Sequence, residues 1–265
     1  MARRRRAGVI IDYHMHLRDP EERVVHTLET VERYVEAVAG QGVDEIGFTE
    51  HVYYFRQTRP VWTLEYQTER CVYDLDAYVA AVVEAKRRGL PVKLGLEVDY
   101  VGERQDELAS LLQPYPWDYL LGSVHWLDGL AVDQQPGIWA QASVEEVWRR
   151  YFAALVELAS SGHVDVLAHP DLVKIFRFRP ERIAYPELDG VALEISTAGL
   201  HKPVGELYPA PELLAARPPI TLASDAHVPA NVGRDLDRAV AHAREAGYDT
   251  VTVFDSRQAR QEPLG

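Results

Sequence analysis

The chain has 265 residues, of which 47% are hydrophobic and 26% are charged. This composition is typical of a globular protein, and the length is sufficient for a full core in either one α/β barrel or two small domains. Its net charge of -13 argues against broad binding to nucleic acids or to anionic membranes. The one cysteine, Cys71, excludes an internal disulfide framework and favours the cytoplasm, and no apolar run reaches transmembrane length.

The N-terminal segment combines a basic tail with a first strand. Residues 1–8 carry four arginines and predict a disordered, solvated tail rather than a signal peptide, because Asp12 and His14 soon interrupt the apolar run. Residues 9–16 then predict a strand that ends at His14 and His16. Because side chains alternate along a strand, both imidazoles point the same way and could bind one divalent metal ion.

Strands and helices alternate through the rest of the chain. Periodicity and capping residues predict, in order, a helix over 27–39, a strand over 44–49, an aromatic-rich loop over 53–73, a helix over 74–88, a strand over 91–96, a helix over 104–112, a strand over 117–124, a helix over 143–161, strands over 164–168 and 190–195, a helix over 211–217, a strand over 220–224, a helix over 232–246 and a strand over 250–254.

This alternation indicates βα units around a parallel sheet. Seven or eight units with polar residues after each strand predict a distorted (βα)7 barrel, similar to a TIM barrel, with the active site at the C-terminal ends of its strands. A doubly wound open sheet is the alternative, although it would bind ligands at one switch point only. Residues 9–265 are expected to form a single domain.

The residues that follow the strands are suited to binding metals. Nitrogen and oxygen ligands without a thiolate favour Zn, Mn or Fe, and so many ligands imply two or three divalent ions with a carboxylate between them. Such ions lower the pKa of a bridging water, so that hydroxide can attack a phosphate ester or an amide. The candidate ligands are His14, His16, His51, Glu97, His125, His169, Asp225 and His227.

The order and strand context of six short motifs resemble the PHP (polymerase and histidinol phosphatase) superfamily. These motifs lie at residues 12–16, 49–51, 95–97, 122–125, 168–171 and 224–227, and the resemblance runs from residue 9 to about 245. Segments 122–129 and 193–209 are similar to the histidinol-phosphate phosphatase branch, which hydrolyses L-histidinol phosphate in histidine biosynthesis.

The resemblance implies three metal positions. His14, His16, Glu97 and Asp225 would hold the first ion, Glu97, His125 and His169 the second, and His51 and His227 a third, more exposed ion. The family's remaining third-site ligand, a histidine, corresponds here to Glu22, and Asp19 and Glu21 are alternatives. Asp225 or His227 would pass a proton to the leaving alkoxide.

The phosphate loop departs from the branch, which commonly has arginine where this chain has His201. Lys202, Arg177 or Arg179 could supply the missing charge, and Trp126 could line the substrate pocket. The expected partner is a small phosphorylated substrate, and a homodimer is left open. The alternatives are a PHP hydrolase for a nucleotide, sugar phosphate, phosphotyrosine or amide, or a metal-binding accessory module without turnover.

Overall fold

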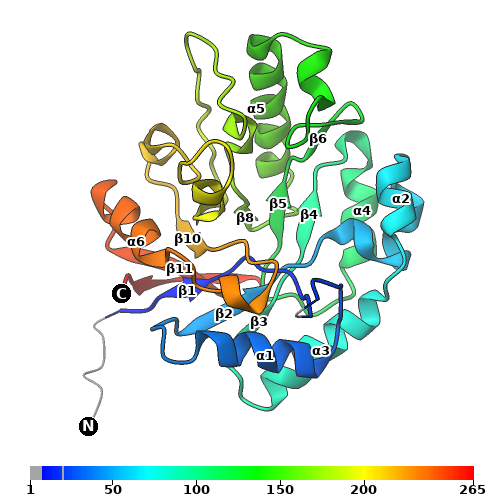
Figure 1. Cartoon of the computed structure of the whole chain (residues 1–265), viewed down its shortest axis with the longest axis vertical. Coiled ribbons are helices and arrows are strands. Elements are labelled where there is room, and N and C mark those ends of the chain that lie inside the picture. Colours follow the sequence, from blue (N-terminus) through cyan, green and yellow to red (C-terminus); the bar gives the residue numbers. More distant parts are fainter. Residues whose placement is uncertain (1–7, 20) are drawn as a thin grey trace.

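The structure is a computed structural model that describes residues 8–19 and 21–265. Apart from Gly8, the tail predicted over residues 1–8 lies outside the described residues. Parallel strands run through the centre of the molecule, and helices surround them (Figure 1). The strands are β1 (Ile11–Asp12), β2 (Glu45–Phe48), β3 (Val92–Leu94), β4 (Glu97–Asp99), β5 (Leu121–Ser123), β6 (Trp126–Leu127), β7 (Leu130–Ala131), β8 (Val166–Leu167), β9 (Ala192–Ser196), β10 (Ile220–Ala223), β11 (Thr250–Asp255) and β12 (Gln258–Pro263).

The helices form in segments whose apolar residues recur on one face. In α5, Tyr151, Leu155 and Leu158 are fully buried, and the side chain of Ser143 caps the helix by accepting a hydrogen bond from the backbone N–H of Glu146. The α-helices are α1 (Leu28–Val38), α2 (Glu65–Arg70), α3 (Leu75–Arg87), α4 (Gln105–Leu112), α5 (Val144–Ser160) and α6 (Leu236–Glu245).

The parallel strands form two sheets, with the orders β1-β2-β3 and β10-β9-β8-β5-β4. Main-chain hydrogen bonds join these sheets on both sides. The N–H of Tyr13 donates to the carbonyl of Leu222 at 2.9 Å, just after β1, and the N–H of Glu97 donates to the carbonyl of Glu50 at 3.0 Å, just after β2. These bonds bring together strand ends that are far apart in the sequence.

The structure confirms the predicted α/β alternation and parallel sheets, but several elements differ from expectation. The helix predicted over 211–217 is a short 3-10 helix, Pro211–Leu214, because Arg217 adopts a positive φ of 56° and two prolines follow it. The prediction missed α2, both strands of the β6–β7 hairpin and the antiparallel strand β12. Strand β12 has mostly exposed polar side chains, so it lacks the apolar alternation by which a strand is recognised.

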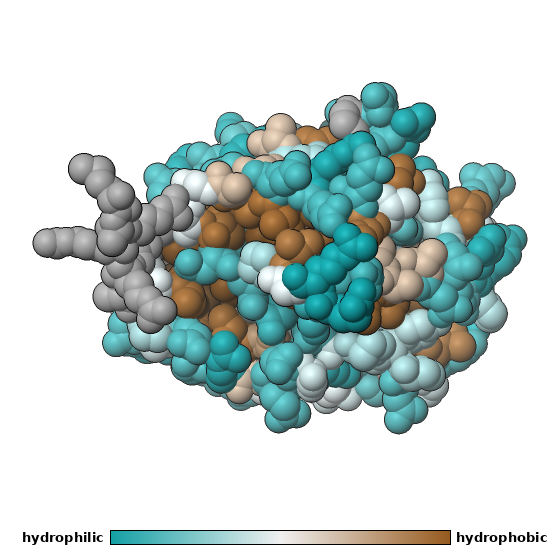
Figure 2. Space-filling model, turned by 90° about the horizontal axis from the view of Figure 1, so that it is seen from below, coloured by the Kyte–Doolittle hydropathy of each residue, from teal (hydrophilic) through white to brown (hydrophobic). Residues whose placement is uncertain are grey.

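Apolar side chains on the surface are mostly scattered. The exposed large hydrophobic residues among those described are Val72, Val83, Val156 and Phe178. Seen from below, one apolar area lies left of centre, and smaller apolar spots lie among hydrophilic side chains elsewhere on this face (Figure 2). No helix in the described part of the chain is both long enough and apolar enough to cross a membrane. The homodimer left open above stays a prediction.

A buried carboxylate, Asp118, holds three parts of the fold together. It is 1% exposed, and both of its oxygens accept from the ammonium of Lys86 on α3, at 2.7 and 2.6 Å. It also accepts from the backbone N–H of Leu94 on β3 at 2.8 Å and from that of Ser256 in the β11–β12 turn at 3.3 Å. Loss of this side chain would leave a cation and two backbone donors without their acceptor.

We therefore expect Asp118→Ala to lower the free energy of unfolding by about 3 kcal/mol, because one partner of a largely buried ion pair is removed. The surface variant Glu84→Ala, on the same helix, removes the partner of Arg87 and Arg88 and should lower the free energy of unfolding much less, because exposed ion pairs contribute little. Urea unfolding midpoints at constant m-value measure both effects. Equal midpoint shifts for the two variants would contradict the role given to Asp118.

Candidate metal centre

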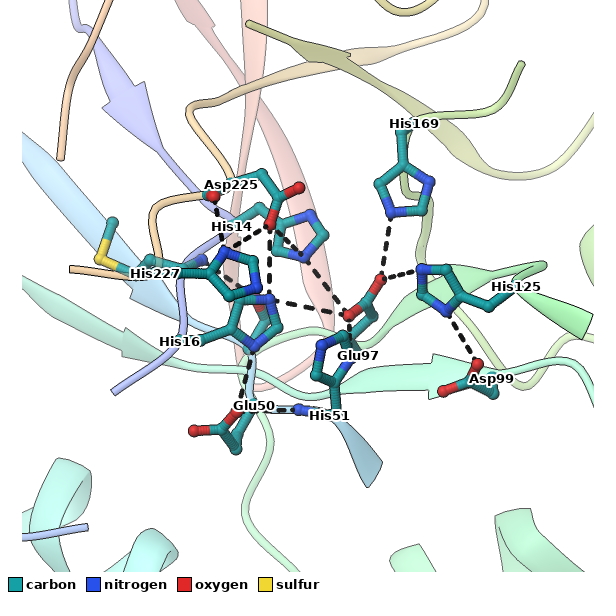
Figure 3. Close-up of polar contacts among 12 residues, drawn as sticks. His14, His16, Glu50, His51, Glu97, Asp99, His125, His169, Asp225 and His227 are labelled. Atoms are coloured by element: carbon teal, nitrogen blue, oxygen red, sulfur yellow. Dashed lines mark hydrogen bonds and ion pairs between the residues drawn. The ribbon is translucent and has the colours of Figure 1, made fainter. Parts of the chain in front are cut away.

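Of the nine predicted metal ligands, all except Glu22 come together at the C-terminal ends of the strands (Figure 3). Figure 3 shows their side chains converging on Glu97 and Asp225. Within each of four overlapping groups, the possible ligand atoms lie within 4.8 Å of one another. The groups are His14–His16–Asp225, His14–Glu97–His169, His51–Glu97–His125 and His16–His51–His227.

Glu97 lies at the centre of the cluster and is 1% exposed. Five imidazoles surround its carboxylate, each with a nitrogen within 4.0 Å of an oxygen. Those distances are 3.6 Å for His14, 3.8 Å for His16, 2.6 Å for His51, 3.5 Å for His125 and 3.2 Å for His169. Both oxygens are engaged in this way, as a carboxylate shared between two cations requires.

Several inward-facing atoms of the cluster lack hydrogen bonds. Nε2 of His14 and Nε2 of His16 are buried and have no hydrogen-bond partner among the described residues. Buried polar atoms are nearly always satisfied in a native protein, because an unsatisfied one costs free energy. A metal ion would engage these unpartnered atoms, so the residues present fit the divalent ions that the sequence predicted.

Three carboxylates that sequence reasoning did not assign hold the outer nitrogens of the imidazoles. Glu194 contacts Nδ1 of His14 at 2.8 Å, Glu50 contacts Nδ1 of His16 at 3.1 Å, and Asp99 contacts Nδ1 of His125 at 2.8 Å. A carboxylate at Nδ1 keeps the proton there and leaves Nε2 to face the centre. Glu194 and Asp99 are charged residues within buried strands, which is the sequence signal that could have found them.

The charges of the cluster are arranged to receive a cation. Burial alone would raise the pKa of Glu97, but the neighbouring His51, His125 and His14 hold it well below its usual range. Burial likewise opposes ionisation of Asp225, and again nearby histidines keep its pKa well below the ordinary value. Burial would lower the pKa of His125, yet Glu97 and Asp99 raise it to about 10. The carboxylates therefore favour positive charge at this position.

The loop that follows His16 does not bring the remaining predicted ligand to the cluster. Glu22 is exposed, has a positive φ of 63° and belongs to none of the four groups. The two alternatives, Asp19 and Glu21, both contact the guanidinium of Arg23, at 2.6 and 3.1 Å. The third metal position therefore has His16, His51 and His227 as its possible ligands among the described residues.

The predicted substrate-binding residues lie in segments that follow the parallel strands, and most of them contact other protein groups. His201 pairs with Asp235 at 2.7 Å, and Arg177 donates to the carbonyl of Val204 at 3.2 Å. Lys202 is exposed. Trp126 lies directly after His125, on β6, and packs against the ring of Tyr66 with centroids 4.9 Å apart.

An α/β fold with a buried cluster of histidines and carboxylates at its strand ends defines a metal-dependent hydrolase. The family model for the PHP domain matches residues 12–198. The chain belongs to the PHP family.

Similar proteins span most of the chain. A relative from Deinococcus radiodurans, named "Probable histidinol-phosphatase", is 33% identical and covers 90% of this chain and 94% of its own length. A "Histidinol-phosphatase" from Bacillus subtilis is 26% identical, with 77% and 90% covered. The crystal structure of histidinol phosphate phosphatase from Lactococcus lactis, complexed with Zn, L-histidinol and phosphate, matches with a TM-score of 0.69 at 19% identity, covering 96% of this chain and 99% of that one.

The carboxylates behind the imidazoles can be tested through metal affinity. We expect Asp99→Ala to weaken Zn²⁺ or Mn²⁺ binding by about 10- to 100-fold, because His125 loses the group that fixes its proton and orientation. The matched control is Asp106→Ala, which breaks a similar contact, with His163 at 2.7 Å, on the exposed surface. Competition with a chelator measures both affinities, and equal values for the wild type and both variants would contradict this role for Asp99.

Proposed function

We propose that this protein is a metal-dependent phosphomonoesterase that hydrolyses L-histidinol phosphate to L-histidinol and phosphate. The observation that carries the proposal is the buried histidine–carboxylate cluster around Glu97, in a chain of the PHP family. The names of its relatives support the choice of substrate, since the relatives from D. radiodurans and B. subtilis are both called histidinol-phosphatase.

We propose that the cluster binds two or three divalent ions, with Zn, Mn and Fe as the candidates. His14, His16, Glu97 and Asp225 would hold the first, Glu97, His125 and His169 the second, and His51 and His227 the third. The Zn in the complex from L. lactis supports this class of metal. When bound, such ions would activate water as the nucleophile and neutralise the charge on the phosphoryl oxygens.

We assign the handling of the leaving group to Asp225 and His227. The side chain of His227 is 47% exposed, whereas that of Asp225 is 13% exposed, so His227 is the more accessible of the two. Nδ1 of His227 lies 3.0 Å from the backbone carbonyl of Asp225, and Nε2 is the ring nitrogen left to face a ligand. We propose that His227 is the better placed of the two to donate a proton to the departing alkoxide when no third ion is bound, because Nε2 cannot carry a proton while it binds a metal.

The substrate would lie between the cluster and the loops above it. We propose that Trp126, next to His125, forms an apolar wall for the substrate, and that His201, Lys202 and Arg177 line the outer part of the pocket. The pairing of His201 with Asp235 supports a role in shaping the loop.

We further propose that the two parallel sheets together make one distorted (βα)7 barrel, and that residues 9–265 form a single domain acting in the cytoplasm. The hydrogen bonds between Tyr13 and Leu222 and between Glu97 and Glu50 support the barrel. The net charge of -13 supports a small-molecule substrate rather than a nucleic acid.

The function can be tested on chelator-treated protein supplied with Zn, Mn or Fe. We expect phosphate release from L-histidinol phosphate to return with metal and to exceed that from p-nitrophenyl phosphate and AMP, because the pocket would recognise the alcohol as well as the phosphate. A preference for another ester would support phosphatase activity but would show that the natural substrate is a different one. Metal binding without turnover of any ester would overturn the proposal and favour an accessory module or a non-phosphate substrate.

A further inference from the structure

A buried arginine, Arg18, stands beside the metal centre and has no part in the function as described so far. It follows His16 by two residues, and its side chain is only 7% exposed. Its Nη1 donates to Oε2 of Glu50 at 2.8 Å and to the carbonyl of Leu17 at 2.9 Å. Its backbone N–H donates to the hydroxyl of Tyr34, at 3.1 Å. The guanidinium is therefore held in one place.

The Arg18 guanidinium lies beside the most exposed of the four ligand groups, His16–His51–His227. Glu50, which binds Arg18 through Oε2, contacts Nδ1 of His16 through Oε1 at 3.1 Å. On its other side, the Arg18 guanidinium carbon lies 5.4 Å from the ring centre of Tyr54, whose ring centre is 5.3 Å from that of His51. Arg18 is thus one side chain away from two members of the group His16–His51–His227.

The guanidinium has donors to spare. Arginine carries five N–H donors, and its planar fork matches two oxygens of a phosphate. Among the described residues, the hydrogen bonds of the Arg18 side chain use Nη1 alone, so Nε and Nη2 have no protein acceptor. Most of the cations predicted for this task have other partners: Arg179 pairs with Glu206 and His201 with Asp235, whereas Lys202 is exposed.

The conformation of the loop after His16 leaves the third metal position without one expected ligand, so a protein cation beside it could supply positive charge for phosphate binding. The N–H of Glu22 donates to the carbonyl of Asp19 at 2.9 Å, and this turn leaves Glu22 exposed and away from the cluster. The third metal position thereby lacks the ligand expected at residue 22, while a fixed positive charge lies close to it.

We propose that Arg18 is a phosphate-binding residue of the active site, whose Nε and Nη2 donate to an anionic oxygen of the phosphoryl group. The assignment rests on the proposed function for the identity of the ester, but not for the binding of phosphate itself. The competing role is purely structural, in which Arg18 does no more than neutralise the buried Glu50.

The two roles predict different changes in metal-loaded Arg18→Lys and Arg18→Met proteins. Loss of charge-assisted hydrogen bonds should weaken binding of inorganic phosphate about 10- to 100-fold in Arg18→Met, and less in Arg18→Lys, which keeps the charge but not the fork. The KM for a phosphate ester should rise, and the metal content per chain should stay that of the wild type. The matched control is Arg23→Met in the same loop, where the arginine side chain is 72% exposed and binds Asp19.

Calorimetric titration with inorganic phosphate, together with metal analysis and a thermal midpoint, separates the outcomes. Unchanged phosphate affinity in both Arg18 variants, with or without a loss of stability or metal, would overturn the assignment. If Arg18→Met does not fold, Arg18→Lys decides the question. If the wild-type protein binds phosphate through Arg18 but hydrolyses no ester, the proposed function is wrong, whereas the assignment of Arg18 to phosphate binding is supported.

Discussion

Five imidazoles pack around the buried carboxylate of Glu97, and the arrangement of the strands makes this packing possible. A carboxylate that is 1% exposed is costly to ionise unless positive charge or hydrogen bonds surround it. Glu97 has such surroundings only because histidines from several strand ends reach it. Each of those strands must end at the same level, so the parallel arrangement and the hydrogen bonds between the two sheets are needed for the charge at Glu97 to be tolerated.

The second requirement is that each imidazole presents the correct nitrogen. Glu194, Glu50 and Asp99 each contact an Nδ1 atom from outside the cluster, and the corresponding Nε2 atoms face inward. This arrangement holds the rings before any metal arrives, so less conformational entropy is lost on binding. It also gives Glu50 two tasks, because the same carboxylate fixes the guanidinium of Arg18 beside the cluster.

Much of the fold and of the centre could be predicted from local patterns. The alternation of helices and strands and the histidine, glutamate or aspartate after each strand are properties of short segments, so they are visible without any tertiary contact. The segment 211–217 shows the limit of this reasoning, since its apolar residues suit a helix while the backbone at Arg217 and the prolines after it stop one. Strand β12 shows the opposite limit, because it pairs through its backbone and its side chains carry no apolar pattern.

Strand periodicity and residue type are local properties of the sequence, and they sufficed to predict the class of fold and the family. They also sufficed to predict eight side chains that come together at the strand ends as possible metal ligands. Three features arise only in the folded chain: the pairing of each carboxylate with its imidazole, the position of Glu22 outside the cluster and the burial of Arg18 beside it. The contact between His14 and Glu194 spans 180 residues of chain. No local pattern can specify such a pairing, since it exists only after the sheets have brought distant strands together.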